Sequence, residues 1–128
     1  MPALTPAAAP IDRRQIGQHA EARAAQYLRA AGLVVLHRNY LCRRGELDIV
    51  ARHGPTLVVA EVRLRASMRY GGAAASITRA KQRRIVYATR HLLARYPSLQ
   101  RLPVRFDALL VPADDGPIEW LRGAFDAF

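Results

Sequence analysis

The chain has 128 residues, enough for one domain that buries about two-thirds of the surface of its unfolded chain. Its net charge of +10, in which every basic residue except Lys81 is an arginine, favours a polyanionic partner, with nucleic acid ahead of an anionic membrane surface. Cys42 is the single cysteine and no apolar run nears the roughly 20 residues of a membrane helix, so we expect a cytoplasmic protein without an intrachain disulfide.

Residues 1–11 are predicted to be a disordered leader, and residues 12–128 a single domain. The leader is interrupted by three prolines and lacks the basic start of a signal peptide. Asp12 followed by Gln15 fits a capping box, which predicts a helix that ends near Ala31 with Gly32 as its stop.

Glu21 lies at the edge of the apolar stripe of this first helix. The stripe comprises Ile16, Ala20, Ala24, Leu28 and Ala31. One interpretation of Glu21 is a boundary carboxylate paired with an arginine. The other is a third carboxylate that reaches an acidic cleft formed farther along the chain.

The next segment is predicted to be a short buried strand, Leu33–Leu36, followed by a polar and basic crossing over residues 37–44. The crossing carries Arg38, Arg43 and Arg44. A loop that contacts phosphate and a solvated connection fit this composition equally well.

Residues 45–65 contain the main chemical pattern of the sequence. Two runs rich in Val, Ile and Leu flank a Gly-Pro turn, which predicts a β-hairpin. A turn centred on that dipeptide places Asp48 opposite Glu61, with Cβ atoms roughly 4.5–5.5 Å apart, and Arg63 on the same face as Glu61. Because two such carboxylates repel unless a cation or proton lies between them, a divalent metal site beside a phosphate-binding arginine is one interpretation. A surface salt bridge from Glu61 to Arg63 or Arg65 is the other.

The segment 66–75 is rich in Gly and Ala, carries Arg69, and suits a loop that contacts substrate. A second helix is then expected to begin after Ser76 or Thr78 and to end at Tyr96, before a proline.

Lys81 falls on the inward stripe of this second helix, so its amine is expected to extend to the rim of the core, where the acidic cleft is one destination. The rest of the stripe is Ile77, Ile85, Ala88 and Leu92. The outer face is strongly basic and includes Arg79, Arg83, Arg84, Arg90 and Arg95.

The C-terminal part is predicted to form two more strands, at residues 104–111 and 118–121. Asp107 is expected to pair with Arg105 or with a hairpin arginine, and Phe125 and Phe128 to anchor the C-terminus on the core. The histidines lack metal-ligand spacing, and no nucleophile elbow or nucleotide-binding fingerprint occurs.

Several short sequence motifs follow one another along the chain, each occurring once. They are Gly17 with Glu21, Arg38-Asn39, Gly45-Glu-Leu-Asp48, Glu61-Val-x-x-Arg65, Gly71-Gly72, Lys81-Gln82 and Arg105-Phe-Asp107. By these patterns, from about Gly17 to Phe125, the chain resembles the YraN-like proteins, uncharacterised protein family 0102. Those small bacterial proteins are grouped with the restriction-endonuclease-like nucleases, near the archaeal Holliday-junction resolvases and the tRNA-endonuclease-like fold.

The resemblance implies an α/β fold with a mixed central sheet of about five strands flanked by helices. It also implies a site for Mg²⁺ or Mn²⁺ made of Asp48 and Glu61, with Glu21 contributed by the first helix. The superfamily pattern ends in Glu-x-Lys, whereas this chain has Arg63 at the last position. An arginine stays protonated, so it can hold a phosphate but cannot help to prepare a water for attack as a lysine can.

The leading hypothesis is a metal-dependent endonuclease acting on DNA rather than RNA, with branched or junction DNA as a candidate substrate and a homodimer as the state that symmetric junctions would favour. Its catalytic residues would be Glu21, Asp48, Glu61, Arg63, Lys81 and Gln82. The residues that contact the nucleic-acid backbone would be Arg38, Arg43, Arg44, Arg65, Arg69, Arg79 and Arg83. The alternatives are a nucleic-acid-binding module with a degenerate, inactive nuclease site, and a protein-interaction adaptor.

Overall fold

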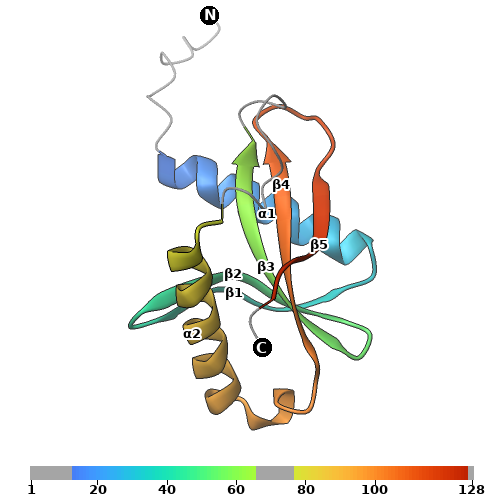
Figure 1. Cartoon of the computed structure of the whole chain (residues 1–128). Helices are drawn as coiled ribbons and strands as arrows, with labels where there is room; N and C mark the ends of the chain where they lie inside the picture. Colours follow the sequence, from blue (N-terminus) through green and yellow to red (C-terminus); the bar gives the residue numbers. More distant parts are fainter. Residues whose placement is uncertain (1–12, 66–76, 127–128) are drawn as a thin grey trace, which may run out of the picture.

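The computed structural model describes residues 13–65 and 77–126 (Figure 1). The predicted leader, Arg69, the Gly71-Gly72 pair, the alternative cap Ser76 and Phe128 lie outside these residues. In chain order the elements are α1 (Arg13–Ala30), β1 (Val34–Cys42), β2 (Gly45–His53), β3 (Thr56–Arg65), α2 (Arg79–Arg95), the 3₁₀ turn η2 (Pro97–Leu99), β4 (Val104–Pro112) and β5 (Glu119–Phe125).

The five strands form one mixed sheet in the order β1-β2-β3-β4-β5. Strands β3 and β4 are parallel, and the other three neighbouring pairs are antiparallel. A parallel pair requires a crossover connection, and the chain between β3 and β4, which includes α2, provides it. This architecture confirms the predicted α/β fold with a mixed five-stranded sheet and flanking helices.

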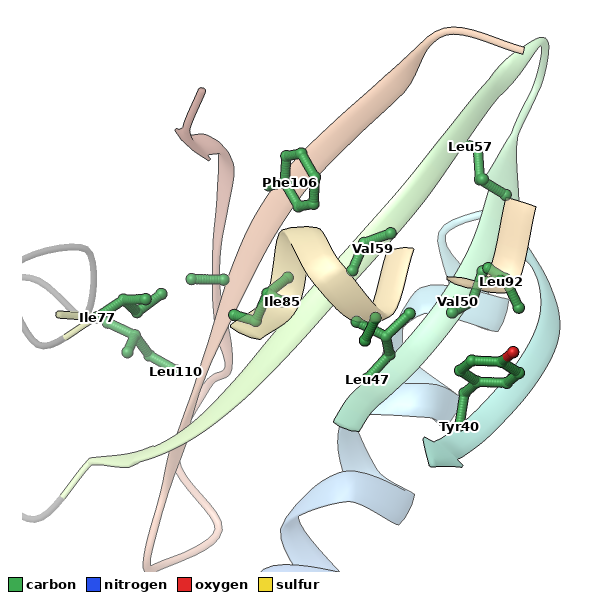
Figure 2. Close-up of a cluster of buried hydrophobic side chains, with 12 residues drawn as sticks. Tyr40, Leu47, Val50, Leu57, Val59, Ile77, Ile85, Leu92, Phe106 and Leu110 are labelled. Carbon is green, nitrogen blue, oxygen red and sulfur yellow. The ribbon is translucent and has the colours of Figure 1, made fainter. Parts of the chain in front are cut away.

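Each helix covers a different face of the sheet, as Figure 1 shows. On the α1 face, Ala24 and Leu28 pack in one buried cluster with Ile49 and Val58. On the α2 face a second cluster joins α2 to the strands (Figure 2). Its labelled members are Tyr40, Leu47, Val50, Leu57, Val59, Ile77, Ile85, Leu92, Phe106 and Leu110. Buried apolar faces on both sides explain why the central strands read as continuous runs of Val, Ile and Leu.

Two predicted helix-end signals are confirmed, whereas the predicted cap Asp12 lies outside the described residues. After α1, Gly32 takes the left-handed φ of +95°, and the amide of Leu33 donates to the carbonyl of Leu28 at 3.0 Å, which closes the helix end. Before α2, the hydroxyl oxygen of Thr78 accepts a hydrogen bond from the amide of Lys81 at 3.1 Å. Neither of the two helices in the described ranges is long and apolar enough to cross a membrane.

The predicted loop over residues 37–44 is wrong, because β1 continues through most of it. Cys42 pairs with Gly45 at the end of the β1–β2 ladder, so only Arg43 and Arg44 are left for the turn. The polar composition misled the prediction because β1 has β2 on one side only, and many of its side chains are exposed. Tyr40 is the buried exception, and its hydroxyl lies 2.6 Å from Nδ1 of His91.

The last strand, β5, is also longer than predicted, because it extends four residues beyond the predicted end.

Gly45 marks the closest approach of β2 to α2. A Cβ atom at this position would lie 2.5 Å from the backbone oxygen of Arg84 and 3.3 Å from the Cβ of Ala88. We therefore expect Gly45→Ala to lower the free energy of unfolding by roughly 1–3 kcal/mol in urea titrations, because the strand or the helix must shift. Gly17→Ala is the matched control, since no atom lies within 4 Å of its added methyl and the change favours a helix by about 0.5–1 kcal/mol. Equal effects of the two substitutions would contradict this packing constraint.

Candidate functional site

The site is built where β2 and β3 separate. The last backbone pair of their ladder is Ile49 with Ala60, in the register that was predicted for the hairpin. One step farther along, the amide of Val62 donates to Oδ2 of Asp48 at 2.9 Å. The Asp48 side chain therefore replaces a strand carbonyl as the hydrogen-bond acceptor, and it lies in the fork between the two strands.

Glu61 lies next to Asp48 and is almost completely buried, with 5% of its surface exposed. Burial raises the pKa of Glu61 to about 8, and the negative charge of Asp48 and a side-chain hydrogen bond to it add to the rise. The ammonium of Lys81, 3.4 Å from Oε1 of Glu61, acts in the opposite direction without cancelling the rise. At pH 7 a carboxyl with this pKa carries a proton most of the time.

A third and a fourth carboxyl group face Asp48. One carboxylate oxygen each from Glu21 on α1, Glu46 on β2 and Asp48 lie within 4.8 Å of one another. Burial raises the pKa of Glu21, and the charges of Asp48 and Glu46 raise it further. Three acidic groups from two elements are thus held at a separation where they repel one another.

Asn39 on β1 is the polar neighbour of this cluster. It lies between the pairs Arg38–Ile49 and Tyr40–Leu47, and so faces Asp48 across the β1–β2 ladder. Its φ of +54° is in the left-handed region, which Asn tolerates better than most residues. A side-chain hydrogen bond from Asn39 to Glu21 lowers the pKa of that carboxyl, against the larger effects that raise it.

These residues can be compared with the predicted metal set of Glu21, Asp48 and Glu61. The structure brings Glu21 and Asp48 into one group of carboxylates, and Asp48 also contacts Glu61. The third member of the group is Glu46, which the sequence analysis did not assign to the site. Its position two residues before Asp48 on a strand, and therefore on the same side of it, was the available signal.

The cluster fits a hard divalent cation. Mg²⁺ and Mn²⁺ prefer oxygen ligands, and carboxylates at this separation supply both the ligand type and the negative charge. Burial is the largest cause of the raised pKa of Glu21 and of Glu61, and the charge of Asp48 is the second. A cation at this point would oppose both, because it favours the ionised carboxylates.

The other predicted catalytic residues lie on β3 and in the first turns of α2. Arg63 is half-buried, two residues beyond Glu61 and on the same face of β3. Lys81 reaches Glu61, as its place on the inward stripe predicted. Gln82 donates from Nε2 to the carbonyl of Ile77 at 3.0 Å, so its amide holds the start of α2.

The predicted backbone-binding arginines divide by location. Arg43 and Arg44 occupy the exposed β1–β2 turn, and Arg79 and Arg83 are exposed on α2. Arg38 is exposed on β1, close enough to Glu21 to lower the pKa of that carboxyl. Arg65 differs from these, because its guanidinium pairs with Glu119 of β5 at 2.9 Å.

Arg23 on α1, which the sequence analysis did not single out, fixes the helix that carries Glu21. Its guanidinium donates to the carbonyls of Pro112, Asp114 and Gly116 at 2.9–3.1 Å. The contact spans about 90 residues of sequence and connects α1 to the β4–β5 loop. Glu21 is therefore positioned by a helix anchored at a second point of the sheet.

Asp107 is fully buried and joins β4 to β5. It accepts hydrogen bonds from Arg105, the Trp120 ring and the Gly123 amide, at 2.9–3.0 Å. The predicted pairing with Arg105 is confirmed. With its four hydrogen bonds made inside the fold, Asp107 serves the architecture of the sheet.

The pKa of Glu61 predicts how stability changes with pH. Because the folded-state value of about 8 lies above the ordinary value of 4.5, the folded chain binds this proton more tightly. The resulting stabilisation is complete below pH 4.5 and is lost as the pH rises through 8. Glu61→Gln, which mimics the protonated form, should therefore be more stable than the wild type at pH 9 by on the order of 5 kcal/mol, with little difference at pH 5.

Urea unfolding at pH 5, 7 and 9, without divalent ions, measures this difference. Glu119→Gln is the control, because that carboxylate is exposed and its loss should leave the pH dependence of stability nearly unchanged. Parallel pH curves for the wild type and Glu61→Gln would contradict a raised pKa at Glu61.

Comparison with known proteins places the chain among relatives of similar length. The model of the uncharacterised protein family UPF0102 matches residues 20–111, a range that includes the acidic cluster, Glu61 and Lys81. A UPF0102 protein of Methylobacillus flagellatus is 47% identical over 115 residues, which cover 89% of this chain and 99% of the relative. UPF0102 proteins of Nitrosomonas europaea and Paracidovorax citrulli are 48% and 52% identical, over 86% and 89% of this chain and 92% and 84% of the relatives.

Proposed function

The chain belongs to the uncharacterised protein family UPF0102, and from the geometry of its acidic site we propose that it is a metal-dependent nuclease that cleaves DNA. The observation that carries this proposal is the convergence of Glu21, Glu46 and Asp48 beside the buried Glu61 and its half-buried partner Lys81. The net charge of +10 supports a polyanionic substrate. Carboxylates held this close to one another repel unless a cation lies among them, which favours a metal site over an ordinary surface feature.

Glu21, Glu46 and Asp48 would hold the ion, Mg²⁺ or Mn²⁺, with Glu61 on the other side of Asp48. When bound, the ion would supply a lowered pKa for an attacking water and neutralise charge on the scissile phosphate.

Glu61 and Lys81 are the residues of the chain best suited to proton transfer. A carboxyl whose pKa is about 8 exchanges its proton near neutral pH, where a general acid or base works best. The Lys81 amine lies 3.4 Å from this carboxyl and reaches it from α2. Lys81 therefore supplies a lysine to the site from α2. The β3 position two residues after Glu61, where the superfamily pattern has a lysine, is Arg63 in this chain.

Arg63 presents a planar guanidinium with several N–H donors, so its role in the proposal is to hold the phosphate and stabilise developing negative charge. The exposed arginines of the β1–β2 turn and of α2 would bind the backbone without reading sequence, which gives strong salt dependence.

The second candidate function is a nucleic-acid-binding module without chemistry. The observation that favours it is Arg63, because a guanidinium cannot replace an amine that helps to prepare the attacking water. The two functions differ in whether they require the acidic residues of the site. The nuclease needs these carboxylates for cleavage, whereas the binding module binds nucleic acid without them.

Cleavage of labelled linear, flapped and four-way DNA with Mg²⁺ or Mn²⁺ tests the proposal. We expect Asp48→Asn and Glu46→Gln to lower the rate by about 10²-fold or more, because each removes a ligand charge from the cluster. Lys81→Met should also lower the rate, with DNA affinity retained. Asp115→Asn, an exposed carboxylate in the β4–β5 loop, is the matched control and should cleave like the wild type.

Other outcomes separate the alternatives. If the wild type leaves every substrate intact while it and Asp48→Asn bind DNA equally, the binding module is the better description. Cleavage gained only in Arg63→Lys would indicate a silenced site. No affinity for nucleic acid at moderate salt would support a protein-interaction adaptor.

A further inference from the structure

An exposed flank of α2, called its outer face below, carries a groove of about 520 Å³. This volume is within the roughly 300–1,000 Å³ that is typical of ligand sites. The groove is lined by Arg79, Gln82, Arg83, Val86, Tyr87 and Arg90, and Asp126 adds a carboxylate. A smaller hollow of about 260 Å³ adjoins it and is also lined by Arg83 and Tyr87, together with Arg44 and Arg84.

Tyr87 lines both hollows. Its side chain is 41% exposed, which is high for an aromatic ring in the middle of a helix and shows that it is not part of the core. The guanidinium of Arg44 lies 5.4 Å from the ring centroid, within cation–π range. Arg44 lines only the smaller hollow, whereas Tyr87 lines both, so the ring is also accessible from the larger groove.

The surroundings of this ring are positively charged. Arg79, Arg83 and Arg90 lie along the larger groove, and Arg44 and Arg84 along the smaller one. An exposed aromatic ring between arginines is the arrangement by which proteins bind single-stranded nucleic acid, with a base on the ring and phosphates on the cations.

Residues that line the two hollows are close neighbours in the chain of residues of the acidic site. Arg44 is two residues before Glu46, so their Cα atoms are about 7 Å apart along the chain, roughly the spacing of one nucleotide. On α2, Lys81 contacts Glu61, while the next residue, Gln82, lines the groove. A strand bound along α2 would therefore lie near the acidic site at both elements, the β1–β2 turn and the start of α2.

We propose that the outer face of α2 binds an unpaired strand of the DNA substrate, with one base stacked on Tyr87 and the neighbouring phosphates on Arg44, Arg79 and Arg83. The inference rests on the proposed function, because it takes DNA to be the substrate. It also narrows that substrate: the bases of a duplex are already stacked on one another, so Tyr87 can accept a base only where pairing is interrupted, as in a flap, a fork or an open junction.

The test measures binding to an oligo(dT) strand that contains one 2-aminopurine, in EDTA so that cleavage plays no part. Tyr87→Leu should weaken binding about tenfold and abolish the quenching of 2-aminopurine fluorescence that stacking causes. Tyr87→Phe keeps an aromatic ring and should retain both. Arg83→Gln should weaken binding and reduce the salt slope by about one, whereas Arg29→Gln, in the last turn of α1, should change neither.

Binding by Tyr87→Leu with wild-type affinity and wild-type quenching would overturn the inference. So would equal affinity for blunt duplex and single strand that is unaffected by Tyr87→Leu, since it would mean that the groove holds backbone alone. Stacking in EDTA without any cleavage when Mg²⁺ or Mn²⁺ is added would support the inference and contradict the proposed nuclease. Absence of binding to every nucleic acid at moderate salt would overturn both.

Discussion

Repulsion between like charges at the β2–β3 fork is the constraint around which this end of the molecule is organised. Four carboxyl groups, from Glu21, Glu46, Asp48 and Glu61, lie close together where the ladder stops. The fold tolerates them through local compensation: the Val62 amide donates to Asp48, a proton remains on Glu61 near neutral pH, and Lys81 faces that carboxyl. These compensations come from β3 and α2, so the acidic cluster depends on how the strand and the helix are placed against each other.

The parts of this arrangement that depend on local chemistry could be predicted from the sequence. The Gly-Pro turn set the register of β2 and β3, Gly32 and Thr78 set helix ends, and the stripe of α2 directed Lys81 toward the acids. These features depend on neighbours a few residues away, where caps, turns and periodicity act. The roles assigned to Glu21, Asp48 and Glu61 as metal ligands remain predictions, because placement in a cluster does not establish what it binds.

The features that were missed depend on residues far apart in the sequence. Residues 37–42 become a strand through pairing with β2, although their own composition is polar. Arg65 looked available for phosphate, but Glu119 on β5 takes its guanidinium, and nothing in the β3 sequence indicates that pair. Glu46 was not assigned to the site, because the approach of α1, which brings Glu21 to Glu46 and Asp48, is not visible in the local sequence. The anchoring of α1 by Arg23 was hidden for the same reason, since its three partners are single backbone carbonyls in a distant loop.

The left-handed residue in β1 has a consequence for how copies of the chain meet. β1 is an edge strand of the sheet, and its Val34 and Leu41 are exposed. A regular β1 would therefore present unpaired backbone N–H and C=O groups, to which a second chain could add its own strand. Asn39 at φ +54° and the register shift between Val35 and His37 break the regular row of edge hydrogen-bonding groups at two places. The same backbone kink that brings an amide to Glu21 thus protects the protein against edge-to-edge aggregation, and any symmetric pairing of two copies should use another surface.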